Sequence, residues 1–393
     1  MSPSDVVIVS ARRTPIGAFL GVLSPLSAVQ LGSAAVKAAL ESAAVAPADV
    51  QEVIMGCVLP AGLGQAPARQ AALGAGVPQA TAATTVNKMC GSGLKAVMMA
   101  ADQIRAGTAD IVLAGGLESM SNAPYLLPKA RTGYRMGPGE LVDHMMRDGL
   151  QSPFDGKPMG AFADATAAKY NFSRAQQDAF ATESVRRAMA AMQGGEFDTE
   201  VTPVTIKGRK GETVIARDET PGTCDISRIP TMKPVFNKDG TVTAASSSSI
   251  SDGAAALVLA SERTASAKGL KPIARVLAYA SNAHEPEWFT TAPVGAIRKV
   301  LGQLGWKPHD ADLYEINEAF AVVTMAAMRD IDIDHARVNV NGGACALGHP
   351  IGATGARILT TLIHALRRRG GKRGIATLCI GGGEAVALAV EVL

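Results

Sequence analysis

The fold is decided by a stretch that occurs twice in the chain, ADIVLAGGLE at residues 109–118 and IATLCIGGGE at residues 375–384. Each copy is a run of apolar residues that leads into glycines and ends on a glutamate. Such a run, bounded by turn residues, is typical of a buried strand. The repeat predicts that the chain consists of two similar halves.

The repeat extends beyond these two strands. Upstream of each copy the same spacing of helix, proline and acidic turn recurs, with Val36, Lys37, Leu40, Pro47 and Asp49 matched by Ile297, Arg298, Leu301, Pro308 and Asp310. GLKAV at residues 93–97 is likewise matched by GARIL at residues 355–359. Helices that alternate with apolar strands indicate a mostly parallel sheet covered on both faces. We therefore predict an α/β protein whose two halves are related by a pseudo-twofold axis, with their sheets stacked.

The segment between the halves has a different character, because it holds many isolated charges and turn signals. Helical periodicity appears at residues 160–169 and 173–192, and Ser173 with Gln176 predicts a capping box for the second helix. Lys207–Arg217 is typical of a charged hairpin. We predict three domains: a first half (residues 1–121 plus 250–272), an insertion (122–249) and a second half (273–393).

Composition and charge exclude several classes of protein. With 47% hydrophobic residues, 41 glycines and a net charge of +3, the chain is neither disordered nor a typical nucleic-acid binder. Five cysteines without a CxxC pair favour a reducing compartment over a disulfide framework or a zinc site. No apolar run is long enough to span a membrane, and a predicted strand at residues 6–10 leaves no room for a leader peptide. We expect a cytoplasmic protein.

Cys90 is the first candidate for chemistry. It lies in NKMCGSGLKA at residues 87–96, where a β-branched run meets a turn of small residues and a helix begins. Small residues let the backbone approach a ligand closely, and the start of a helix favours the thiolate. A buried structural cysteine is the commoner fate of a free thiol. The local sequence alone leaves both interpretations open.

Three further residues follow predicted strands at the same end of the sheet. His349 lies in NGGACALGHPIGATGAR at residues 341–357, which occupies the place of the Cys90 loop in the second half. Cys379 ends the last repeated strand. Asn317 follows another strand, where the pattern alone favours a helix cap. Ligands of open α/β sheets bind beyond the carboxyl ends of strands, so His349 and Cys379 are expected to face Cys90. The remaining cysteines have weaker claims: Cys57, Cys224 and Cys345.

Two thiols and an imidazole suit acyl transfer between sulfur atoms. One thiolate can attack a thioester at nearly equal energy, and a second thiol can act as acid or base. Backbone N–H groups in the glycine turns can stabilise an oxyanion. The set therefore predicts an S-acyl enzyme, including carbon–carbon bond formation next to a thioester.

Four motifs resemble the thiolase family, most closely its acetyl-CoA acetyltransferase branch. They are VNKMCGSG (86–93), NEAF (317–320), NGG through GHPIG (341–352) and CIGGG (379–383), and the resemblance covers nearly the whole chain. It implies the duplicated thiolase fold, five αβαβα layers with two stacked mixed sheets, and an inserted loop domain that binds coenzyme A.

The resemblance also implies roles for individual residues. Cys90 would carry the acyl group, His349 would activate it, and Cys379 would exchange the α-proton. Asn317 would hold a water that forms one oxyanion hole with His349, while the N–H groups of Cys90 and Gly381 would form the other. Contacts to coenzyme A are implied for Ser248, Met159, Ala319, Phe320, Phe236, Met232 and Ala244.

The implied reaction is the reversible condensation of two acetyl-CoA by a ping-pong mechanism in a homodimer or homotetramer. Coenzyme A thioesters would be substrates, with no cofactor and no metal. A broad-chain 3-ketoacyl-CoA thiolase of fatty-acid degradation and a non-catalytic acyl-CoA-binding protein are the alternatives. Departures from the family pattern that affect the expected substrate site include the serine run at residues 246–249, Pro158, and Phe289 at the acyl pocket.

Overall fold

In the computed structural model, which describes residues 5–209 and 211–393, strands of both halves form one ten-stranded mixed sheet. The order is β12-β13-β14-β11-β1-β10-β5-β3-β4, and β2 pairs with β10. The first-half strands are β1 (Val6–Arg13), β2 (Gly17–Ala18), β3 (Glu52–Gly56), β4 (Ala82–Val86), β5 (Ile111–Ser119) and β10 (Ser251–Ser261). The second-half strands are β11 (Ala274–Ala283), β12 (Leu313–Ile316), β13 (Arg373–Ile380) and β14 (Glu384–Val392).

The two halves are joined through β1 and β11, where Val7 and Ile8 pair with Arg275 and Ala274. The two sheets implied by the resemblance are therefore continuous through this short antiparallel contact. Both strands are otherwise edges of their own group, and pairing satisfies backbone groups that an edge leaves open.

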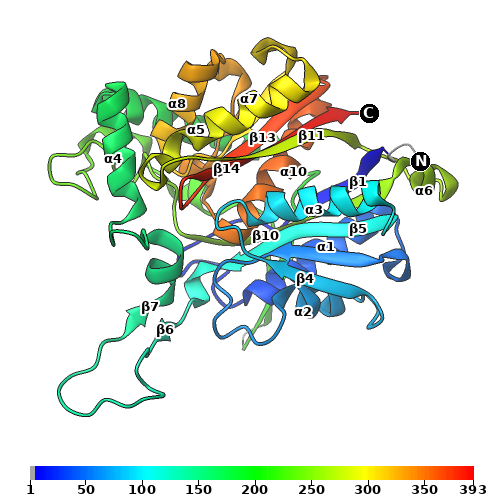
Figure 1. The fold of residues 1–393 in the computed structure, drawn as a ribbon, viewed down its shortest axis with the longest axis horizontal. Helices are drawn as coiled ribbons and strands as arrows, with labels where there is room; N and C mark the ends of the chain where they lie inside the picture. The colour runs from blue at the N-terminus through cyan, green and yellow to red at the C-terminus, as the bar shows by residue number, and fades with distance from the viewer. Residues whose placement is uncertain (1–4, 210) are drawn as a thin grey trace.

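Helices complete the expected layers (Figure 1). α3 (Ser92–Ala106) and α10 (Ile351–Arg369) pack against each other between the two strand groups. α1 (Ala28–Ala43) and α2 (Pro67–Gly74) cover the outer face of the first group. α7 (Ala292–Leu304) and α8 (Ala321–Ile331) cover the second. The result is the predicted order of helix, sheet, helix, sheet and helix.

Glycine explains why the sequence repeats where the two central helices touch. A Cβ at Gly93 would lie 2.8 Å from the Ala356 nitrogen, and one at Gly355 would lie 2.3 Å from the Leu94 nitrogen. Any larger side chain at either position would push the helices apart. The glycines in GLKAV and GARIL thus match because both lie in the same contact, one on each of the two helices that the pseudo-twofold axis relates.

The strand pairings also repeat. β3 runs parallel to β5 as β12 runs parallel to β13, and β10 and β14 are their antiparallel neighbours. The counterpart of β4 is reduced to a single parallel bridge between Tyr314 and Val338. The predicted internal duplication is confirmed at the level of topology.

The described elements between residues 122 and 249 stay outside the large sheet. They include α4 (Met159–Tyr170), α5 (Arg174–Gln193), and the strand pairs β6 (Tyr125–Leu126) with β7 (Val142–Asp143) and β8 (Val204–Gly208) with β9 (Gly211–Ile215). The predicted capping box is present, since the Ser173 hydroxyl accepts from the Gln176 N–H. The predicted hairpin is β8–β9, with residue 210 outside the described residues, as are residues 1–4 of the first predicted domain.

Short helical segments connect these elements. They are η1 (Pro47–Asp49), η2 (Met120–Asn122), the π-helical η3 (Met146–Leu150), η4 (Thr220–Thr223), η5 (Ile226–Thr231), α6 (Glu262–Ala267), η6 (Pro286–Thr291), η7 (Pro308–Asp310), η8 (His335–Arg337) and α9 (Ala344–Leu347). Within the described ranges, no helix is long and apolar enough to cross a bilayer.

Candidate active site

Cys90 lies in a tight, strained turn between β4 and α3. Met89 adopts a left-handed φ of 46°, which a non-glycine residue rarely does. The Ser92 side chain holds the turn, because its hydroxyl donates to the Met89 carbonyl at 2.6 Å and accepts from the Lys88 N–H at 2.8 Å. Strain of this kind costs about 1–3 kcal/mol and clusters at functional sites.

The Cys90 thiol is less acidic than its position at a helix start suggested. Burial raises its pKa to about 11, although N–H groups of Gly381 and of Cys90 itself hydrogen-bond the sulfur and lower it. Desolvation of the thiolate therefore outweighs the favourable N–H groups. The expected thiolate is absent from the resting state, and a base is needed to form it.

His349 has the protonation state of such a base. Its Nδ1 lies 2.6 Å from the Thr354 hydroxyl, and that hydroxyl donates its proton to the Pro350 carbonyl at 2.9 Å. The hydroxyl oxygen must then accept from Nδ1–H, which leaves the lone pair on Nε2. This Nε2 is buried and has no partner among the described residues. Burial, reinforced by the charge of Arg357, lowers the His349 pKa to about 3, so the ring is neutral near pH 7.

Cys379, near the end of β13, and Gly381, in the turn that follows, lie beside Cys90. Cys379 is fully buried at the end of β13, and both burial and the nearby charge of Cys90 raise its pKa well above the ordinary value. Gly383 has a φ of 90°, and a Cβ there would lie 2.4 Å from the His284 carbonyl oxygen. The glycine run therefore permits the turn that places the Gly381 N–H on the Cys90 sulfur.

Asn317 is buried beyond the end of β12, and neither amide atom finds a partner within the described chain. The neighbouring Glu318 holds the backbone around Asn317 in place through its hydrogen bonds. The Glu318 carboxylate accepts from the Ser184 hydroxyl at 2.7 Å, from Asn339 Nδ2 at 2.8 Å and from the Cys345 N–H at 3.1 Å. Asn317 is thus a rigidly placed amide whose donor and acceptor are available to a ligand or a water.

A cavity of about 410 Å³ leads to His349. Six predicted residues line it: Met159, Phe236, Ala244, Ser248, Phe320 and His349. The serine run holds one wall, because the Ser248 N–H donates to the Ala319 carbonyl at 3.0 Å and the His349 N–H donates to the Ser249 carbonyl at 3.1 Å. The structure therefore brings residues of both halves and of the insertion to one cavity.

Three predicted contacts lie outside the lining of this cavity. Ala319 is behind the wall, where its carbonyl holds Ser248. Phe289 packs edge-on against Phe162 at 6.2 Å, in the cluster that contains Cys379. Met232 follows η5, and its carbonyl accepts from Arg174.

The other cysteines are held in structural contacts. Cys57 and Cys345 are buried beside Glu118 and Glu318, and each donates its thiol to an oxygen of that residue, at 3.7 and 3.8 Å. Cys224 is half-buried in a separate apolar cluster.

Sequence reasoning missed the residues that orient the site. Thr354 fixes the His349 tautomer, and its position one turn into the following helix was the available signal. Glu118, the glutamate that ends the first repeated stretch, accepts from the N–H groups of Val58, Leu59 and Gly352 at 2.8–3.1 Å. Burial raises the Glu118 pKa to about 7. Its recurrence as Glu384 was visible but carried no assigned role.

The two pKa shifts predict how Cys90 responds to pH. Because the resting pair is a thiol and a neutral imidazole, alkylation of Cys90 by iodoacetamide should keep accelerating as pH rises from 6 through 9. Peptide mapping would follow Cys90, with half-buried Cys224 as an internal reference. A rate that reaches a plateau near pH 7 would reveal a thiolate–imidazolium pair and contradict this electrostatic description.

Comparison with known proteins agrees with this geometry. The family model described as the thiolase N-terminal domain matches residues 6–263, and that of the thiolase C-terminal domain matches residues 270–392. Acetyl-CoA acetyltransferase 2 of Arabidopsis thaliana is 50% identical over 396 residues, which cover 100% of this chain and 98% of that protein.

Solved structures share the whole fold. The acetyl-CoA acetyltransferase of Bacillus anthracis superimposes with a TM-score of 0.97 at 42% identity and covers 100% of both chains. A thiolase of Ascaris suum in complex with coenzyme A has a TM-score of 0.94 at 43% identity, covering 99% of this chain and 100% of its own. The duplicated fold, the four motifs and these matches agree, and the chain belongs to the thiolase family of acyltransferases.

Proposed function

We propose that this chain is an acetyl-CoA acetyltransferase that interconverts two acetyl-CoA with acetoacetyl-CoA and coenzyme A. The observation that carries the proposal is the contact of the Cys90 sulfur with the Gly381 turn, which sets a second thiol, Cys379, beside the nucleophile. Relatives of this name match over the full length. A binding protein would need neither the paired thiols nor a neutral buried imidazole.

The first half-reaction in the cleavage direction begins with proton transfer from Cys90 to Nε2 of His349. The thiolate attacks the 3-keto carbon, and the Cys90 and Gly381 N–H groups stabilise the oxyanion. The carbon–carbon bond then breaks and leaves an acyl group on Cys90. The departing enolate oxygen is bound by the protonated Nε2 and by a water on Asn317, while Cys379 protonates the carbon. The raised pKa of Cys379 suits this step, since the resting thiol carries the proton.

The second half-reaction restores the enzyme. The Cys379 thiolate takes the proton of the incoming coenzyme A thiol, which attacks the acyl group. Cys90 leaves as a thiolate and recovers its proton from His349. Condensation is the reverse sequence, and all protons balance over the cycle without a cofactor or a metal.

The substrate site combines the insertion with both halves. In this proposal residues 122–249 form the coenzyme-A-binding domain, residues 1–121 and 250–272 the first half, and residues 273–393 the second. The pantetheine arm would occupy the cavity lined by Met159, Ser248 and Phe320. Phe236 packs edge-on against Phe320 at 5.8 Å and would narrow its mouth. The exposed Lys207 of the β8–β9 hairpin would meet the phosphates.

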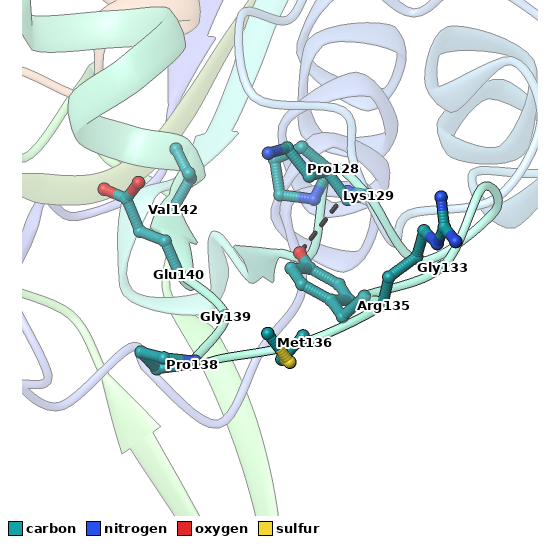
Figure 2. A pocket seen from close by; sticks show the side chains of 10 residues that line it. Pro128, Lys129, Gly133, Arg135, Met136, Pro138, Gly139, Glu140 and Val142 are labelled. Atoms are coloured by element: carbon teal, nitrogen blue, oxygen red, sulfur yellow. Dashed lines mark hydrogen bonds between the residues drawn. The ribbon is translucent and has the colours of Figure 1, made fainter.

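The loop that joins β6 to β7 supports a homo-oligomer. It projects from the body in Figure 1, and its tip encloses a hollow of about 920 Å³ lined by residues of the loop and by Val142 at the start of β7 (Figure 2). Met136 at the tip is 97% exposed, and Tyr134 accepts from the Lys129 N–H at 3.3 Å. β4 is the last described strand of the sheet, and no described strand pairs with its outer edge, which a second copy could cover. We propose a dimer, or a tetramer of paired dimers.

A broad-chain thiolase of fatty-acid degradation is the second candidate, and one cavity favours it. A hollow of about 230 Å³ touches Met89, Met159 and Gly381, next to the nucleophile. An acyl chain on Cys90 could extend into it. In either role, we propose that the enzyme takes part in acyl-CoA metabolism in the cytoplasm.

A chain-length profile tests the proposal. Rates of cleavage by coenzyme A should be highest with acetoacetyl-CoA and fall at least about tenfold with a long-chain 3-ketoacyl-CoA, because the cavity must also hold the pantetheine arm. Equal or higher rates on long chains would favour the second candidate. Failure to cleave any 3-ketoacyl-CoA would refute both.

A further inference from the structure

The glutamate that ends the second repeated stretch, Glu384, forms an ion pair with Lys88. Lys88 belongs to the nucleophile turn of the first half, two residues before Cys90. Glu384 belongs to the second half, where it begins β14 and lies opposite Ile380 in the antiparallel register. The pair therefore links the loop that carries Cys90 to the turn that carries Cys379 and Gly381.

The loops also touch beside the pair. A Cβ on Gly91 would lie 2.4 Å from the Ile380 Cδ1, so the Ile380 side chain packs directly against the Gly91 backbone. The Gly381 N–H reaches the Cys90 sulfur across the same contact. Both side chains of the ion pair are partly shielded, at 24% and 37% exposure. A shielded pair is screened less than a surface pair and can hold a position.

The other copy of the repeat makes the reciprocal link. Glu118 belongs to the first half and accepts from the Gly352 N–H of the second half at 2.8 Å, three residues after His349. Each repeated glutamate thus crosses the pseudo-twofold axis to the catalytic loop of the other half. The structural settings differ, since Glu118 lies within β5 and Glu384 follows the glycine turn.

We propose that Lys88 and Glu384 are positioning residues that set the distance between the Cys90 sulfur and the Gly381–Cys379 turn. This inference rests on the proposed thiolase reaction. Both half-reactions need the Cys90 sulfur, the Gly381 N–H and the Cys379 thiol at fixed distances from one another. A misplacement of about 1 Å can cost a hundredfold in rate. Neither residue exchanges a proton or touches the reacting carbon in this scheme.

The test compares Lys88→Met, Glu384→Gln, the double variant and the swapped variant K88E/E384K with the wild type. Each single change should lower kcat for acetoacetyl-CoA cleavage about tenfold, with little change in the KM for coenzyme A. The double variant should be no worse than either single one, because both remove the same contact. The swapped variant should recover part of the rate. The exposed pair of Lys268 and Asp49, 2.9 Å apart, supplies the matched control, and Lys268→Met should leave kcat unchanged.

Charge alone predicts a different outcome. Lys88→Met removes a positive charge near Cys90 and should slow its alkylation by iodoacetamide, whereas Glu384→Gln should speed it. If kcat followed these opposite directions, or if both single variants stayed within about threefold of the wild type, positioning would be refuted. A wild-type enzyme without cleavage activity would instead overturn the proposed function, and the wild-type measurement separates the two failures.

Discussion

Cys90→Ala should reduce condensation and cleavage by about four to six orders of magnitude, the range seen when a covalent nucleophile is removed. The reason is that Cys90 is the partly exposed thiol of the site, in a turn that Met89 and Ser92 hold under strain. Cys379 is fully buried, and in the proposed mechanism it exchanges a proton and carries no acyl group. Steady-state rates in both directions, together with exchange of label between coenzyme A and acetyl-CoA, would measure the loss.

Cys224→Ala is the control, since that half-buried thiol lies in a separate apolar cluster and should be dispensable. Thermal unfolding should be nearly unchanged in both variants. A Cys90→Ala enzyme that kept exchanging label would place the acyl group elsewhere.

Cys379→Ala should separate the two half-reactions. It should still transfer an acetyl group from acetyl-CoA to Cys90, because a coenzyme A thiolate is stable in water without an enzymic acid. Condensation should fall by about 10²–10⁴-fold, the usual contribution of a general acid or base. The carbon acid needs a base at the carbon itself, and Cys379 is the thiol close enough to sense the charge of Cys90.

Comparison with Cys379→Ser would show that the acidity of the side chain at position 379 matters more than its volume. The serine hydroxyl fills the site but is a far weaker acid, so condensation should remain low. Condensation at the wild-type rate in either variant would make Cys379 a structural residue of the apolar cluster that it shares with Phe162 and Phe289.

Local sequence signals were sufficient for the duplication, but the prediction of a mostly parallel sheet was wrong, because β1, β10, β11 and β14 pair antiparallel with their neighbours. The repeated strands and glycines predicted the duplicated topology. The repeated glycines Gly93 and Gly355 lie in one contact between the two central helices. The capping box at Ser173 and the charged hairpin also followed from short-range rules. Cys90, His349 and Cys379 became candidates because each lies at the end of a predicted strand or in the repeated loop beyond one. The pattern at Asn317 favoured a helix cap, and its proposed role came from the family resemblance.

The supporting contacts could not be predicted in the same way. Lys88 and Glu384 are 296 residues apart in the chain, and the cavity draws its lining from both halves and from the insertion. The acidity of Cys90 was also misjudged, because burial of the turn depends on the packing of the other half. Such effects arise from tertiary packing, which has no local sequence period.

The most direct test of the central claim is to locate the acyl group during turnover. Wild-type enzyme mixed with acetyl-CoA, quenched in acid and mapped by mass spectrometry should carry one acetyl group, on the peptide that contains Cys90. Addition of coenzyme A before the quench should remove it. An acetyl group found on Cys379 or Cys345, or turnover without any covalent adduct, would contradict the account.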